Sequence, residues 1–156
     1  MSMQQKQFMV ACGQTVSAVN FKQAELYTEL IREEVVRELF PAWDKFIASP
    51  THDNTVELLY AIGGSLVVVE GLAFSLGIDP ALIKARVDIS NLSKIPEGKA
   101  KIEKRAYGKI LKPPSFITPY LDDLANRINK PYTYAGLIEN TETTSDVNSS
   151  KQGQVQ

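Results

Sequence analysis

Apolar residues recur at helical spacing in the first third of the chain. Between Phe21 and Phe40 a large apolar side chain occurs every three or four positions, and glutamates fill much of the remaining surface. This pattern is typical of an amphipathic helix that turns one side toward a core. Because proline breaks the hydrogen bonding of a helix interior, we expect this helix to end at Pro41.

Residues 55–76 form a second stretch, which is apolar on nearly all sides. Valine favours strands, so a strand over residues 65–69 is an alternative, but the whole stretch is too long for one strand. We therefore expect a helix that is central in the fold or lies at a subunit interface. Gly63, Gly64 and Gly71 each cost such a helix about 1 kcal/mol relative to alanine, and their expected use is close approach to another helix.

Local sequence marks where further helices begin. Asp79 followed by Pro80 is the pattern of an N-cap with proline at the first helical position, and it predicts a short helix that ends near Asp88. The helical period is then lost, so residues 90–118 are predicted to be a long loop, followed by a last helix over 122–128. The apolar helix has three candidate caps, which are Asp53, Asn54 and Thr55.

Length and composition indicate how the chain is divided into domains. A chain of 156 residues with 44% hydrophobic residues can form one domain with a real core. We expect that domain to span residues 1–138, and the polar segment 139–156 to be a disordered tail. The single cysteine, Cys12, cannot form an internal disulfide, which favours a reducing cytoplasm. The apolar helix contains Glu70 and several glycines, so we expect a buried helix and no membrane span.

The net charge of −1 hides two segments of opposite sign. Residues 21–57 contain eight acids and four bases, whereas residues 84–112 contain nine bases and three acids. The second segment therefore holds more than half of the 17 lysines and arginines of the chain. Such clustering in a nearly neutral protein predicts an anionic partner.

Two motifs in the basic segment carry a resemblance to a known family. They are Ser-Asn-Leu-Ser-Lys at 90–94 and Gly-Lys-Ile-Leu-Lys-Pro-Pro at 108–114, and they follow an acidic helix and an apolar helix that closes with the sequence 71–79. Over about residues 21–121 this order resembles the MazG-like nucleoside triphosphate pyrophosphohydrolases, in particular phage-encoded forms. The resemblance implies an all-α helical bundle with a long basic loop, and a dimer or tetramer that pairs through the apolar helix.

The resemblance also implies a Mg²⁺-dependent release of pyrophosphate by carboxylates in Glu-x-x-Glu and Glu-x-x-Asp pairs. One helical turn places such pairs on one face, where they can bind a hard cation. The acidic helix and the start of the apolar helix lack this spacing. Glu57 is followed three positions later by Tyr60, and the residues three positions after Glu25, Glu29, Glu33 and Glu34 are Thr28, Arg32, Val36 and Arg37. We therefore expect a pseudoenzyme without catalytic residues, metal ligands or cofactor. The alternative is a divergent Mg²⁺-dependent pyrophosphohydrolase that uses Glu33, Glu34 and Glu57.

The basic segment keeps its cations although the metal motif is lost. Lysines and arginines interleaved with aromatic residues suit single-stranded nucleic acid, because cations bind phosphates and aromatic rings stack on unpaired bases. The whole pattern is similar to phage single-stranded-DNA-binding proteins that serve as RNA polymerase cofactors. This resemblance implies RNA polymerase as a partner and the host cytoplasm as the location. The predicted DNA-binding residues are Lys84, Arg86, Lys94, Lys99, Lys101, Lys104, Arg105, Tyr107, Lys109 and Lys112, with Tyr107 as the first stacking candidate.

Two plainer interpretations of the basic segment remain open. A lysine-rich loop is often only a solvated surface, and related lysines in the enzyme family can serve the triphosphate of a single nucleotide. The chain can also be a module that binds a host protein through the apolar helix or the tail.

Overall fold

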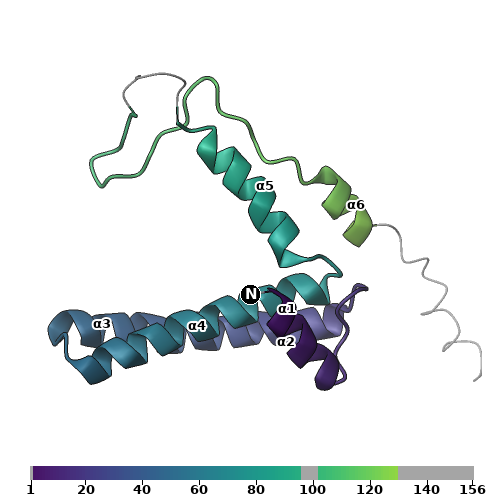
Figure 1. Cartoon of the computed structure of the whole chain (residues 1–156), viewed down its shortest axis with the longest axis horizontal. Helices are drawn as coiled ribbons and strands as arrows, with labels where there is room; N and C mark the ends of the chain where they lie inside the picture. Colours follow the sequence, from purple (N-terminus) through teal and green to yellow (C-terminus); the bar gives the residue numbers. More distant parts are fainter. Residues whose placement is uncertain (1, 96–101, 130–156) are drawn as a thin grey trace, which may run out of the picture.

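The computed structural model describes residues 2–95 and 102–129. Over these residues the chain is helical, without a β-strand, which confirms the predicted all-α class (Figure 1). The segments are α1 (Ser2–Ala11), α2 (Phe21–Ile31), the π-helix η1 (Arg32–Leu39), α3 (Phe40–Ala48), α4 (His52–Ser75), α5 (Pro80–Leu92) and α6 (Asp122–Asn129).

Residues 2–79 form a bundle around α4. The α2, η1 and α3 segments follow one another without a break and lie alongside α4, while α1 crosses it at one end (Figure 1). One buried cluster joins Met9, Tyr27, Val68 and Phe74 from three different helices. A second cluster of small residues and Leu58 lies between α3 and α4. The core therefore follows the apolar α4, as the sequence predicts.

The helix that begins at Phe21 does not end at Pro41, so that prediction is wrong. It continues to Ala48 because the turns before the proline are π-helical. The backbone N–H of Phe40 bonds to the carbonyl of Val35, five residues earlier. In an α-helix the proline ring clashes with the carbonyl four residues before it and removes one hydrogen bond. The wider π turn relieves this conflict, and the proline then lies in the first turn of α3, where it is tolerated.

Several predicted boundaries also need correction. Thr51 caps α4 by accepting a hydrogen bond from the backbone of Asn54 at 3.2 Å, so the helix starts before the predicted caps. The strand alternative for residues 65–69 is wrong, because they lie inside α4. Asp79 caps α5 as predicted, but this helix continues to Leu92 and takes in the start of the predicted loop. The predicted last helix is confirmed as α6. The helix α1 was not predicted, since its sequence has little apolar periodicity.

Two of the three glycines in α4 permit close helix approach. A Cβ added at Gly71 would lie 1.9 Å from the ring of Tyr27, and one added at Gly64 would lie 2.1 Å from a carboxylate oxygen of Glu34. A Cβ added at Gly63 would meet nothing within 4 Å. The predicted use of glycine is therefore confirmed at Gly71 and Gly64 and is wrong for Gly63 among the residues described.

By length and composition α4 is apolar enough to cross a membrane. It packs, however, against α1, α2, η1 and α3 along its course. Core helices of soluble proteins pass the same test but are mostly buried, whereas 33% of the apolar window of α4 is buried within the described residues.

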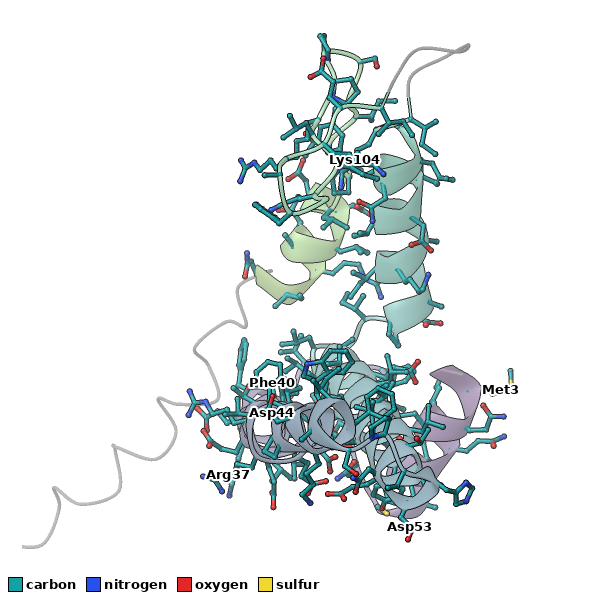
Figure 2. All side chains as sticks on the ribbon, turned by 90° about the vertical axis from the view of Figure 1, so that its left-hand side faces the viewer. Met3, Arg37, Phe40, Asp44, Asp53 and Lys104 are labelled. Carbon is teal, nitrogen blue, oxygen red and sulfur yellow. The ribbon has the colours of Figure 1, made fainter. Side chains whose placement is uncertain are left out.

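Residues 80–95 and 102–129 form an arm that rises from one end of the bundle (Figures 1 and 2). The arm consists of α5, the loop that returns along it, and α6. Ile78, two residues before the arm begins, is only 2% exposed. The predicted tail 139–156 and the predicted domain boundary lie outside the described residues.

Candidate nucleic-acid interface

Near the base of the arm, the predicted DNA-binding cations are engaged by acids of the arm itself. Lys84 pairs with Asp88 one turn further along α5. Arg86 donates two hydrogen bonds to the carboxylate of Asp123 on α6 and a third, of 3.0 Å, to the carbonyl of Tyr120. These hydrogen bonds hold the pKa of Asp123 below its usual value. Arg86 therefore fastens α6 to α5, and Lys84 is neutralised within its own helix.

The Ser-Asn-Leu-Ser-Lys motif anchors the returning loop to the end of α5. The hydroxyl of Ser90 donates to the carbonyl of Ile117 at 2.7 Å, and the backbone N–H of Ile117 donates to the hydroxyl of Ser93 at 2.8 Å. Ser90 is only 3% exposed. The two serines thus have a structural role in this chain, and they fix where the neighbouring cations lie.

Beyond this anchor, two lysines lie over the ring of Phe116. The ammonium of Lys112 is 4.4 Å from the ring centroid and that of Lys94 is 5.9 Å from it. Both distances are within the range of a cation–π interaction. The ammonium of Lys94 also donates to the side-chain oxygen of Asn91 at 2.6 Å. Lys94 and Lys112 are both among the predicted DNA-binding residues. Nothing in the sequence indicated that they share the ring of Phe116.

A short hairpin-like turn carries three further predicted cations, which are Lys104, Arg105 and Lys109. Lys104 and Ile110 form an antiparallel bridge, and the N–H of Gly108 donates to the carbonyl of Arg105 at 2.8 Å. Gly108 adopts φ of 86°, which side chains disfavour, so the glycine is what allows the turn. Tyr107 lies at the turn, is 71% exposed and accepts a hydrogen bond of 3.0 Å from the guanidinium of Arg105.

The pairing therefore sorts the predicted DNA-binding cations of the arm into two groups. Arg127 of α6 is not among them and has no ion pair within the described residues. Lys84 and Arg86 are bound to acids, whereas within the described residues no ion pair involves the five cations further out. Figure 2 shows Lys104 in the half of the arm away from the bundle. We call these cations and the exposed ring at the turn the distal cluster, which consists of Lys94, Lys104, Arg105, Tyr107, Lys109 and Lys112. Lys99 and Lys101 lie outside the described residues.

The glutamates of the enzyme alternative do not converge. Glu57 pairs with Lys45 of α3, and Glu34 packs against Gly64. Among the residues described, no group of three histidine, cysteine or acidic side chains is placed to hold a metal ion. A cavity of about 200 Å³ opens between α4 and the η1–α3 segment, and its lining contains two bases and two acids. The residues that line it are Arg37, Glu38, Pro41, Ala42, Lys45, Glu57, Tyr60 and Ala61.

Glu34 is strained electrostatically. One of its carboxylate oxygens is buried and has no hydrogen-bond partner among the described residues. Burial raises the pKa of Glu34 above its ordinary value of 4.5, and the neighbouring charges of Glu38 and Glu33 raise it further. The charged form therefore destabilises the fold. This destabilisation is present above the raised pKa and is relieved as the pH falls through it.

We expect Glu34→Gln to raise the free energy of unfolding by up to about 1 kcal/mol at pH 7, because it removes the charge of a partly buried carboxylate of which one oxygen has no partner. The advantage should shrink as the pH falls and vanish below the ordinary pKa of 4.5, where both proteins are neutral at this site. Urea denaturation from pH 4 to pH 8 measures it. The control is Glu25→Gln, which removes a charge from an exposed position of α2. An equal advantage of both variants at every pH would contradict this account.

The chain was also compared with known proteins. No model of a known protein family matches it, and no curated protein sequence matches it.

Proposed function

We propose that this protein binds single-stranded DNA without reading its sequence, and that the distal cluster of the arm is the binding surface. The observation that carries the proposal is the division of the cations. At the base, Arg86 joins α5 to α6 and Lys84 pairs with an acid of its own helix. The five cations of the distal cluster have no acidic partner within the described residues, and one of them, Arg105, contacts the exposed ring of Tyr107. These side chains are therefore available to an anionic ligand without the loss of an ion pair of the fold.

The chemistry of the distal cluster suits an unpaired strand. Ammonium and guanidinium groups bind phosphates and release counterions, so their contribution to affinity falls with salt. Tyr107 offers a ring at the turn, and stacking of one base on such a ring is worth about 1–3 kcal/mol. The ring of Phe116 is already used by Lys94 and Lys112. Phe116 therefore positions the two lysines, and Tyr107 remains the candidate for stacking on a base.

The resemblance of the motifs supports the biological setting of the proposal. We propose a MazG-like bundle that has lost its pyrophosphohydrolase activity and acts in phage transcription as a cofactor of RNA polymerase, in the host cytoplasm. The bundle would self-associate into a dimer or tetramer through α4. Four of its apolar residues, spaced by three and four positions, are 40–62% exposed, and these are Leu59, Ile62, Leu66 and Val69. Several arms on one oligomer would then engage one strand together.

The test is fluorescence anisotropy with labelled single-stranded and double-stranded DNA of equal length over a salt series. We expect preferential binding to the single strand. If all five cations of the distal cluster on one arm contact phosphates, the slope of log affinity against log salt is about −3.5 per arm, from 0.7 per contact. Equal or tighter binding to the duplex would overturn the proposal.

If the protein binds neither DNA, the alternative of a divergent Mg²⁺-dependent pyrophosphohydrolase is favoured instead. It would then be tested with deoxynucleoside triphosphates and Mg²⁺. Release of pyrophosphate that requires Mg²⁺ and disappears in Glu57→Gln would establish that alternative.

A further inference from the structure

An apolar seam runs along the outer side of η1 and α3. Val36, Phe40, Trp43 and Ile47 follow one another at spacings of four, three and four residues. They are 57%, 56%, 50% and 60% exposed. This spacing repeats every seven residues and is that of a helix face which packs along a second helix. A continuous seam of large apolar residues is unusual on a monomer surface and marks an interaction site.

The arm carries a second seam of the same kind. Leu82, Ala85, Ile89 and Leu92 follow one another along α5 at spacings of three, four and three. The three large residues are 36%, 64% and 65% exposed. A different face of α5, the one with Arg86 and Ser90, is occupied by α6 and the returning loop. The seam is therefore the side of the arm that its own packing leaves uncovered.

The two seams are matched in length and in charge. Val36 to Ile47 spans about 16 Å along a helix, and Leu82 to Leu92 spans about 15 Å. The bundle, residues 2–79, contains ten acids and five bases, whereas the described part of the arm contains eight bases and four acids. Apolar seams of equal length, carried by parts of the molecule with opposite net charge, favour the contact of one with the other.

Within one copy the seams do not meet. The arm contacts the bundle through α4 at its base and then leads away from it (Figure 1). Phe40 lies on the side of the bundle from which the arm rises, and it is not covered (Figure 2). We propose that α5 of one copy packs on the η1–α3 seam of a second copy, and that the second arm returns the contact. A reciprocal contact of this kind closes as a twofold-symmetric dimer.

This proposal does not depend on the proposed DNA binding. The seam lies on α5, whereas the cations of the distal cluster lie at and beyond its end. It also differs from self-association through α4, because α4 contributes no residue to either seam. Failure of one proposal can thus be told from failure of the others.

Trp43 makes the contact measurable, because it is the only tryptophan of the chain. The full-length protein is diluted from about 100 µM to about 0.1 µM, and its mass and tryptophan emission are followed together. This dilution detects dissociation constants between about 0.1 µM and about 100 µM. We expect the mass to halve and the emission of Trp43 to shift to the red together, as the ring becomes exposed to water. A mass that halves with unchanged emission would overturn the proposal.

The decisive variant carries substitutions in the arm, and its effect is measured on Trp43 in the bundle. Ile89→Asp with Leu92→Asp should reproduce the red-shifted emission of Trp43 at high concentration, with unchanged helix content by circular dichroism. The matched control, Leu59→Asp with Leu66→Asp on α4, should leave the emission of Trp43 at the value of the unchanged protein. If the arm variant leaves the emission unchanged, or the α4 variant shifts it equally, the proposal is wrong.

A mixing experiment distinguishes docking between two copies from docking of an arm onto its own bundle. Trp43→Phe protein, which has an intact arm but no tryptophan, is added to the arm variant, which has the tryptophan but a disrupted arm. Docking between copies predicts that the emission shifts back toward the blue on mixing. No recovery, with a blue emission of the unchanged protein that does not depend on concentration, would show that the arm folds onto its own bundle.

Discussion

Gly71→Ala should be the most destabilising single-methyl change in the bundle, by about 2–3 kcal/mol. The added Cβ would lie 1.9 Å from Cε1 of Tyr27. Rotation of the methyl group does not remove this steric clash. Tyr27 is 3% exposed, and its hydroxyl donates to the side chain of Gln14 at 2.8 Å. The ring must therefore move within a packed core, or the two helices must separate. Urea denaturation at fixed protein concentration measures the loss.

The same helix supplies two controls. Gly63→Ala adds its methyl where nothing lies within 4 Å, so its better helix propensity should raise stability by up to about 1 kcal/mol. Gly64→Ala meets only the end of the flexible Glu34 side chain, and its cost should lie between the other two. A loss at Gly63 equal to that at Gly71 would show that helix propensity, rather than the contact with Tyr27, decides the result.

Lys104→Glu with Arg105→Glu should reduce the affinity for single-stranded DNA by at least tenfold near physiological salt. Two phosphate contacts are lost, which flattens the salt slope by about 1.4, and two acids are introduced beside the remaining cations. Both residues belong to the exposed turn, so the bundle should stay folded. The anisotropy titration over a salt series measures affinity and slope together. Unchanged affinity and slope would remove this turn from the binding surface.

The control for that variant is chosen from the base of the arm. Lys84→Gln with Asp88→Asn removes one cation and the acid that neutralises it, so the net charge stays the same. Because Lys84 is engaged with Asp88, the double change should leave affinity and salt slope within about twofold. If it weakens binding as much as the change at the turn, the division of the arm into paired and unpaired cations has no bearing on DNA.

The sequence predicted the helices well where one local signal decided them. Asp79 and Pro80 mark the start of α5 through capping, and the apolar run of α4 is long enough to exclude a strand. The predicted helix end at Pro41 was wrong because the preceding turns are π-helical and accommodate the proline. A π-helical segment has no simple sequence signature. The end of α5 was missed because Ser90 is held there by Ile117, which lies 27 residues away.

The candidate site shows the same limit. Charge clustering was sufficient to indicate the segment, since it depends only on composition. It could not separate Arg86, whose partner Asp123 lies 37 residues further along the chain, from Lys104. Nor could it show that Lys94 and Lys112 share the ring of Phe116. Such contacts depend on how the arm folds back on itself.

The separation of acids and bases between bundle and arm also gives the molecule a large electric dipole. Net charge and isoelectric point, −1 and about 5.9, describe such a protein poorly. Near neutral pH it should adsorb to cation-exchange and anion-exchange media alike, since each medium is met by one end of the molecule. The same dipole would orient the protein before contact, so that a polyanion is approached with the arm in front.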